Sequence, residues 1–207
     1  MKKIGIMGGT FDPIHIGHLL LGQMAYESFH LDEVWFLPNG NPPHKDAVIT
    51  EEALEHRVNM VELATENVPY FRMVLYEAKI GTHSYTYETM GKFNKLYPGT
   101  QFYFILGADS LFAMEEWAHF REIFPTCIIL AAMRDDKDQE DMKEQIAYLH
   151  RKYGANIELL RAPLLEISST TIRRRAFRKQ SVSYMVPDAV ANYIVQNNLY
   201  TEASESI

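Results

Sequence analysis

The chain has 207 residues, of which 47% are hydrophobic and 23% are charged. This composition is typical of a globular protein with a sizeable core and excludes a disordered chain. The formal net charge of −7 argues against a general binder of nucleic acid or of anionic membranes, so an anionic ligand must be held in a local pocket.

The single cysteine, Cys127, excludes a disulfide within the chain and a cysteine-rich zinc site, and its apolar surroundings predict a core residue. The apolar segment after Lys2 and Lys3 is too short for a signal peptide, and no apolar run reaches the length of a membrane span. We therefore expect a cytoplasmic protein folded as one domain over 1–207. Its C-terminal helical segment is expected at about 167–200, and its tail, 201–207, is expected to be mobile.

The first predicted strand, Lys3–Met7, runs through a glycine turn into a predicted helix over Ile16–Phe29. Unpaired N–H groups and the dipole at the start of such a helix favour a phosphate ligand. The spacing of His15 and His18 places both imidazoles on one face, where they can reach the same anion, and Gly17 between them leaves room for a nucleotide. A glycine pair alone is usually a turn and a lone histidine a surface residue, so the hypothesis rests on their combination.

The rest of the chain alternates between apolar runs and segments of helical periodicity. This alternation predicts an α/β fold with a doubly wound, mainly parallel six-stranded sheet, whose ligands bind at the carboxyl ends of the strands where the winding reverses. The predicted strands after the first are Val34–Leu37, Arg72–Leu75, Phe102–Leu106, Cys127–Ala132 and Ile157–Leu160, and the predicted helices are about Glu51–Glu66, Tyr85–Leu96, Ser110–Phe124 in broken pieces, and Asp138–Tyr153.

After the sixth strand, Ser168, Ser169 and Thr170 are favourable residues for a helix N-cap, and Arg173 falls on the first turn of the helix they would start. A well-capped helix with a basic surface explains these residues, but hydroxyls, amides and a guanidinium at one point also suit a polyphosphate. This helix is predicted to break near Ser181. A last helix, started by Pro187, carries apolar positions that serve the core or a dimer contact, and we favour the core.

Five segments of the chain together resemble the bacterial nicotinate-nucleotide adenylyltransferases, in the HxGH nucleotidyltransferase superfamily. They are the turn GGTFDPIHIGH; the Pro-Pro-His-Lys loop, which includes His44 and Lys45; the stretch SYTYET; Gly107-Ala108-Asp109 followed by Trp117; and ISSTTIR with the closing helix. The resemblance implies transfer of AMP from ATP to nicotinate mononucleotide in NAD synthesis. The chain departs from the family's usual Arg-Pro-Gly after the fifth strand, where Arg134 is followed by Asp135 and Asp136.

The resemblance also implies roles for individual residues. His15 and His18 would bind the ATP phosphates and Arg173 would stabilise the departing pyrophosphate. The remaining ATP contacts would be Gly8, Gly9, Thr10, Phe11, Gly17, Gly107, Asp109, Ile167, Ser168, Ser169 and Thr170, and those to nicotinate mononucleotide would be Asn39, His44, Lys45, Thr86, Trp117 and Arg134.

Two of these roles have structural alternatives. Asp109 either hydrogen-bonds a ribose hydroxyl or caps a helix, and Trp117 either contacts a pyridine ring or packs in the core. Magnesium is expected with ATP, because it can bridge phosphates with few protein ligands, and we name no protein metal ligand. No nucleic-acid or membrane partner is expected, and a homo-oligomer is left open. Rival hypotheses are a sister transferase that takes nicotinamide mononucleotide or phosphopantetheine, one that uses CTP with a phospho-alcohol, a nucleotide-sensing module without catalysis, and a structural protein.

Overall fold

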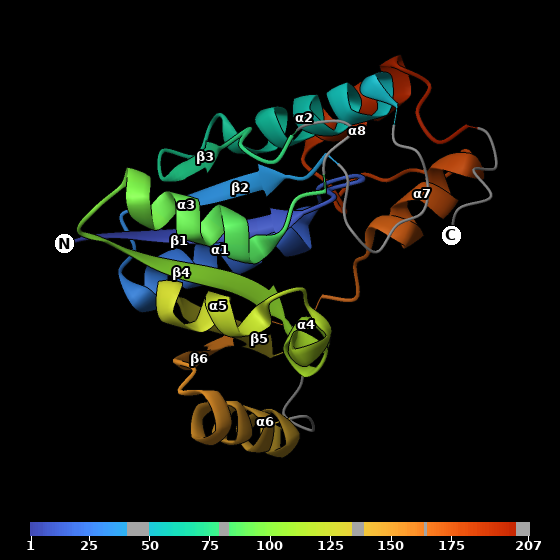
Figure 1. The fold of residues 1–207 in the computed structure, drawn as a ribbon. Coiled ribbons are helices and arrows are strands. Elements are labelled where there is room, and N and C mark those ends of the chain that lie inside the picture. Colours follow the sequence, from blue (N-terminus) through green and yellow to red (C-terminus); the bar gives the residue numbers. More distant parts are fainter. Residues whose placement is uncertain (41–49, 79–82, 134–138, 164, 202–207) are drawn as a thin grey trace.

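The computed structural model describes residues 1–40, 50–78, 83–133, 139–163 and 165–201. Within them, six strands form one parallel sheet in the order β3-β2-β1-β4-β5-β6 (Figure 1). Because this order reverses between β1 and β4, the sheet is doubly wound, and the predicted fold class is confirmed. The strands are β1 (Lys2–Gly9), β2 (Glu33–Pro38), β3 (Phe71–Met73), β4 (Thr100–Gly107), β5 (Ile128–Met133) and β6 (Ile157–Arg161).

Side chains that alternate along the strands feed two separate cores, one on each face of the sheet. Met7 and Phe36 belong to the core covered by α1, α2, α7 and α8, whereas Ile6 and Phe104 belong to the core covered by α3, α4, α5 and α6. The helices are α1 (Ile16–Phe29), α2 (Glu51–Thr65), α3 (Thr86–Leu96), α4 (Ala108–Phe112), α5 (Phe120–Ile123), α6 (Gln139–Tyr153), α7 (Ser169–Phe177) and α8 (Asp188–Gln196), with short 3-10 turns at Met114–Glu116 and Phe124–Thr126.

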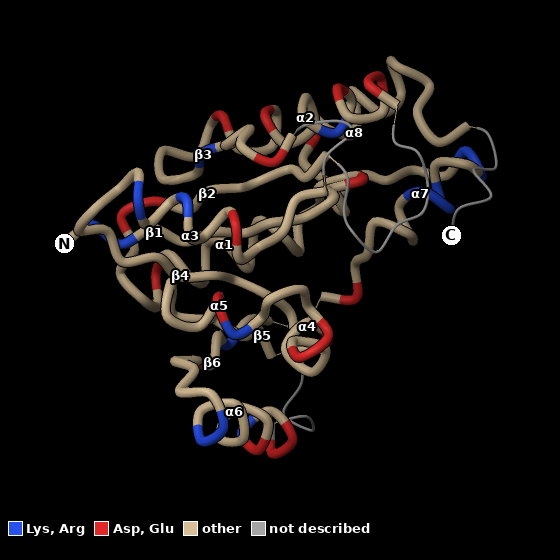
Figure 2. Tube along the Cα trace, in the orientation of Figure 1, with Lys and Arg blue, Asp and Glu red and all other residues tan. Residues whose placement is uncertain are grey.

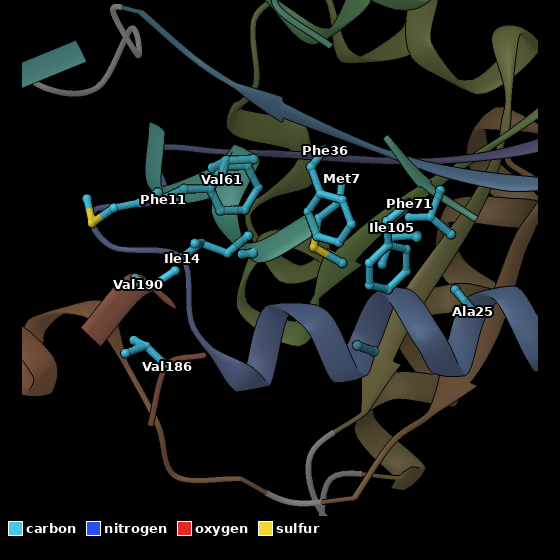
Figure 3. Close-up of a cluster of buried hydrophobic side chains, with 14 of the residues drawn as sticks. Met7, Phe11, Ile14, Ala25, Phe36, Val61, Phe71, Ile105, Val186 and Val190 are labelled. Carbon is cyan, nitrogen blue, oxygen red and sulfur yellow. The ribbon is translucent and has the colours of Figure 1, made fainter. Parts of the chain in front are cut away.

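The carboxyl ends of all the strands lie at one edge of the sheet, and α7 lies beyond that edge (Figure 1). The loop between β1 and α1 is anchored there by two apolar side chains. Phe11 and Ile14 of this loop are buried in the same core as Val61 of α2 and Val190 of α8 (Figure 3). The C-terminal helices therefore pack against the loop that carries the glycine turn.

Several boundaries differ from those predicted. The third strand ends at Met73 rather than Leu75, because Leu75 is exposed and its carbonyl accepts the N–H of Ala78 in a turn. The helix α7 ends at Phe177, before the predicted break near Ser181. The broken pieces predicted over 110–124 are confirmed as α4, a 3-10 turn and α5, with a second 3-10 turn at the end.

Two predictions about the core are confirmed. Cys127 is buried, and so are the apolar side chains Val190 and Ile194 of the last helix. No helix among the described residues is both long and apolar enough to cross a membrane.

Candidate active site

The loop between β1 and α1 adopts a backbone that its sequence specifies closely. Phe11 has a φ of +50°, which side-chain-bearing residues rarely adopt, and its ring is only 3% exposed. A Cβ added at Gly9 would lie 3.0 Å from this ring, so a larger residue at this position would force the ring of Phe11 to shift. Because the ring of Phe11 is buried, only the backbone of this residue is left for the predicted contact with ATP.

His15 and His18 stack on each other at the start of α1. Their ring centroids are 3.7 Å apart with an interplanar angle of 23°, and the edge of Phe11 closes on His18 with centroids 5.1 Å apart. The main-chain N–H of His15 donates to Nδ1 of His18 at 3.3 Å. The residue His15 is only 7% exposed, and His18 is partly buried.

Gly17 has a local role that the sequence did not indicate. A Cβ at this position would lie 3.0 Å from Nδ1 and 3.1 Å from Cε1 of His15. The lack of a side chain at Gly17 therefore makes room for the imidazole of His15, and through it for the stacked pair, while the room expected for a nucleotide stays a prediction.

Burial, together with the smaller effect of repulsion from His15, lowers the pKa of His18 to about 3. Its imidazole is therefore neutral near pH 7. Since Nδ1 accepts the backbone N–H, the neutral ring carries its proton on Nε2. His18 thus presents a fixed hydrogen-bond donor.

We expect acid to destabilise the folded protein through His18. In the unfolded chain the imidazole takes up a proton near its ordinary pKa of 6.5, but in the folded protein only near 3. Between these values the unfolded state binds more protons, so the free energy of unfolding rises with pH and levels off above the window. Lowering the pH from 7 to 5.5 should cost about 1 kcal/mol through this residue.

Urea unfolding of the wild type and of His18→Gln at both pH values measures this contribution. The glutamine does not titrate, so its smaller loss of stability isolates the imidazole. An equal loss in both proteins would contradict the burial of a neutral His18.

The amino end of α7 meets the same loop. Ser168 is the N-cap of α7, as predicted, and its hydroxyl accepts a backbone N–H of the first turn. Ser169 Oγ donates to the carbonyl of Pro13 at 2.9 Å, and Arg173 Nη1 donates to the carbonyl of Asp12 at 2.7 Å. The structure thus brings the amino end of α7 against the loop at residues 12–13, shortly before α1 begins at Ile16.

Other predicted residues of this segment have supporting positions. Ile167 packs against the core, and Thr170 Oγ1 accepts from Arg173 Nη2 at 3.4 Å. Arg174 and Arg178 are exposed, so α7 adds positive charge at this edge of the sheet (Figure 2).

One expectation about α1 is wrong in detail. The sequence predicted that amides of its first turn would be free to hold a phosphate, but the N–H of Ile16 donates to the carbonyl of Met185 at 2.9 Å and that of His18 to the carbonyl of His15 at 2.9 Å. The segment before α8 supplies the acceptor for Ile16, and no local pattern could have indicated it.

Sequence reasoning missed two residues that hold this loop in place. Arg57 of α2 is 3% exposed, and its Nη1 donates to the carbonyls of Thr10 and Asn39 at 2.7 Å each. Tyr200 donates its hydroxyl to Asp12 Oδ1 at 2.7 Å. Burial lowers the pKa of the Arg57 guanidinium, an effect that the nearby Asp12 carboxylate opposes. Arg57 comes from α2 and Tyr200 from the turn after α8, so both are distant from the loop in sequence.

Beyond this loop, the carboxyl ends of β1 and β4 leave space above the sheet. A Cβ added at Gly8 or at Gly107 would have no neighbour within 4 Å. Trp117 is half-buried and packs edge-on against Phe104 of β4, with ring centroids 6.2 Å apart. Asp109 is exposed in the first turn of α4, whose N-cap is Gly107, so the alternative role of Asp109 as the cap residue is not realised.

On the other side of β1, the end of β2 approaches the start of α3. The N–H of Asn39 donates to the carbonyl of Gly9 at 3.0 Å, while its Oδ1 is buried without a hydrogen-bond partner in the described part of the chain. Gly40 N donates to the carbonyl of Glu77, whose side chain accepts from Thr89 of α3. Thr86 is the first residue of α3 and is half-buried. The predicted contacts His44, Lys45 and Arg134 lie outside the described residues.

A separate surface hollow lies between α4 and α6, lined by Phe112 and by side chains of α6 that include Tyr148 and Arg151. None of its lining residues is a predicted site residue. Among the described residues, no three His, Cys, Asp or Glu side chains are placed to hold a metal ion.

Comparison with known proteins is consistent with this geometry. A sequence model of the cytidylyltransferase-like family matches residues 6–175. A probable nicotinate-nucleotide adenylyltransferase of Lachnoclostridium phytofermentans is 45% identical over 201 residues, which cover 97% of this chain and 100% of that protein. A protein of the same description from Clostridium novyi is 39% identical over the same shares.

A solved structure has the same fold. It is a Plasmodium falciparum nicotinic acid mononucleotide adenylyltransferase complexed with NaAD, which superposes with a TM-score of 0.75 at 21% identity over 97% of this chain and 98% of that one. The family match and the full-length relatives together show that the chain belongs to the nicotinate-nucleotide adenylyltransferases, within the cytidylyltransferase-like family.

Proposed function

We propose that this adenylyltransferase transfers AMP from ATP to nicotinate mononucleotide with the triphosphate bound between the amino ends of α1 and α7. A phosphate oxygen of the mononucleotide attacks the α-phosphorus in line, and the bond to the bridging oxygen breaks as pyrophosphate leaves, which gives deamido-NAD. This reaction needs positioning and charge stabilisation rather than a nucleophilic residue. The observation that carries the proposal is the stacked His15–His18 pair, joined to Arg173 through the loop at residues 12–13.

In this proposal His18 is the donor to the α-phosphate. Its Nδ1 is occupied by a backbone N–H, so Nε2 carries the proton that meets a phosphate oxygen as negative charge builds in the transition state. Stacking against His15 and the edge contact with Phe11 hold the ring in one orientation before ATP arrives. His15 supports this ring and reaches the phosphates only through the small part of its own ring that is open.

The backbone of the loop supplies further donors. Arg57 donates a hydrogen bond to the carbonyl of Thr10, and Ser169 donates one to the carbonyl of Pro13. Because C=O and N–H of a trans peptide point in opposite directions, the N–H groups of Phe11 and Ile14 face away from these protein donors. We propose that they face the reacting phosphates.

Arg173 is placed to stabilise the departing pyrophosphate. Its guanidinium has five N–H donors, and the two contacts to Asp12 and Thr170 leave others for a planar, bidentate contact with phosphate oxygens. The exposed Ser168 and the first-turn amides of α7 lie beside it, in the region proposed for the β- and γ-phosphates.

We propose that Mg²⁺ accompanies ATP. Such an ion takes most of its ligands from phosphates and water, so it needs few from the protein. When bound, it supplies neutralisation of phosphate charge, and the residues named above orient the phosphates.

The mononucleotide is proposed to lie over the carboxyl ends of β1 and β4, where Gly8 and Gly107 leave space. Trp117 offers a flat face to the pyridine ring, and Thr86 with the amino end of α3 offers donors to the nicotinate carboxylate. A carboxylate has only acceptors, whereas the amide of nicotinamide brings an NH₂ that such donors cannot satisfy. Asn39, the residue after β2, is proposed as a further contact, with His44, Lys45 and Arg134 proposed for the mononucleotide phosphate.

Pyrophosphate release, measured with ATP or CTP against nicotinate mononucleotide, nicotinamide mononucleotide and phosphopantetheine, tests this proposal. We expect ATP with nicotinate mononucleotide to be the fastest pair. Thr86→Ala should lower the preference for the acid over the amide by about tenfold, since it removes one donor to the carboxylate. Trp117→Ala should raise the KM for both mononucleotides.

The exposed Thr201→Ala variant is the matched control for the threonine change. A preference for CTP or for phosphopantetheine in the wild type would favour a sister activity. An unchanged acid-to-amide ratio in Thr86→Ala would remove Thr86 from the selectivity, and an unchanged KM in Trp117→Ala would remove Trp117 from the contact with the pyridine ring.

A further inference from the structure

Tyr200, four residues after the end of α8, reaches back to the loop between β1 and α1. Its hydroxyl donates to Asp12 Oδ1 at 2.7 Å across 188 residues of sequence. Tyr200 has a φ of +63°, so the backbone bends there to direct the ring toward the loop. Burial and the carboxylate of Asp12 both raise the pKa of the Tyr200 phenol, which therefore stays protonated and acts as a donor.

The partner of Tyr200 lies next to the guanidinium of Arg173 without forming a close ion pair with it. Arg173 Nη1 donates to the main-chain carbonyl of Asp12 at 2.7 Å, whereas the carboxylate oxygen Oδ2 of Asp12 is 3.9 Å from the same nitrogen. A direct charge-assisted bond between these groups would be about 2.8 Å long. The carboxylate is thus kept beyond hydrogen-bond distance from the cation beside it.

We propose that Tyr200 is a positioning residue that holds the Asp12 carboxylate off Arg173 and so keeps the guanidinium available to pyrophosphate. The inference rests on the role proposed for Arg173 above. Without the hydroxyl, the Asp12 carboxylate loses a donor and is free to rotate toward Arg173. A close pair would then compete with phosphate oxygens for the same N–H groups.

Tyr200→Phe removes the hydroxyl and keeps the ring. We expect kcat to fall about tenfold and inhibition by pyrophosphate to weaken by a similar factor, while the KM for nicotinate mononucleotide stays within twofold. Tyr193→Phe is the matched control, because that hydroxyl of α8 contacts His56 and Asn59 of α2 and no group of the proposed site. Equal effects of the two variants would overturn the positioning role.

Asp12→Asn provides the second arm of the experiment. Asparagine accepts the Tyr200 hydroxyl but has no charge to pair with Arg173, so adding Tyr200→Phe to Asp12→Asn should change kcat and pyrophosphate affinity less than twofold. Losses that simply multiply would overturn the inference.

Pyrophosphate binding measured by titration calorimetry on the same proteins does not depend on turnover. It therefore separates the two proposals. If the wild-type protein binds pyrophosphate tightly but does not adenylate nicotinate mononucleotide, the proposed acceptor is wrong. The calorimetric comparison of Tyr200→Phe with Tyr193→Phe then still decides the role of Tyr200.

Discussion

Replacing His18 with alanine should lower kcat by on the order of 10² or more. The wild-type ring is fixed by His15 and Phe11 with Nε2 as its donor, and alanine leaves no donor for the charge that develops on the α-phosphate. Because this interaction strengthens in the transition state, the KM for ATP should change much less than kcat. Steady-state kinetics of pyrophosphate release measures both quantities.

Two further variants sharpen this test. His18→Gln, whose amide can place an N–H near the position of Nε2, should retain more activity than the alanine variant. Gln23→Ala, on the exposed face of the same helix, should be as active as the wild type. Near-normal turnover in a folded His18→Ala protein would refute the assignment of the donor.

The second large effect is expected from Arg173→Ala, which should reduce kcat by about 10² and weaken inhibition by pyrophosphate. The guanidinium connects α7 to the carbonyl of Asp12 and has N–H groups left for phosphate oxygens. Arg173→Lys keeps the charge but loses the planar guanidinium, so its ammonium group can bind the carbonyl of Asp12 or the phosphate but not both. Its kcat should lie between those of the wild type and Arg173→Ala.

Arg174→Ala is the matched control, because Arg174 is the next residue of α7 and is exposed. Thermal unfolding should place Arg173→Ala a few degrees below the wild type, owing to the lost contacts to the loop. If kcat of a folded Arg173→Ala protein stayed within twofold of the wild type, Arg173 would not stabilise the departing pyrophosphate.

The fold could be predicted from sequence because its signals are local. Alternating apolar positions along β1 and β4 feed the two cores, and the helix over Ile16–Phe29 was predicted with its observed bounds. The end of the short strand β3 was predicted two residues too late because a turn at Leu75 interrupts an apolar run. Such an ending depends on neighbouring backbone groups rather than on residue type.

The site was predictable only in part. The histidines and the Ser168 cap are specified within a few residues of sequence, so motif and spacing identified them. The groups that shape the loop come from elsewhere: Arg57 reaches Thr10 across 47 residues, and Tyr200 reaches Asp12 across 188. A tyrosine near the end of a chain carries no local sign of such a contact, which exists only once α8 has packed on the core.

The most direct measurement is a crystal structure of the protein with a non-hydrolysable ATP analogue and Mg²⁺. We expect the α-phosphate to lie within hydrogen-bond distance of Nε2 of His18 and the β- and γ-phosphates to contact Arg173 and the amino end of α7. A triphosphate bound at another edge of the sheet, or one that leaves both His18 and Arg173 without contact, would contradict this expectation.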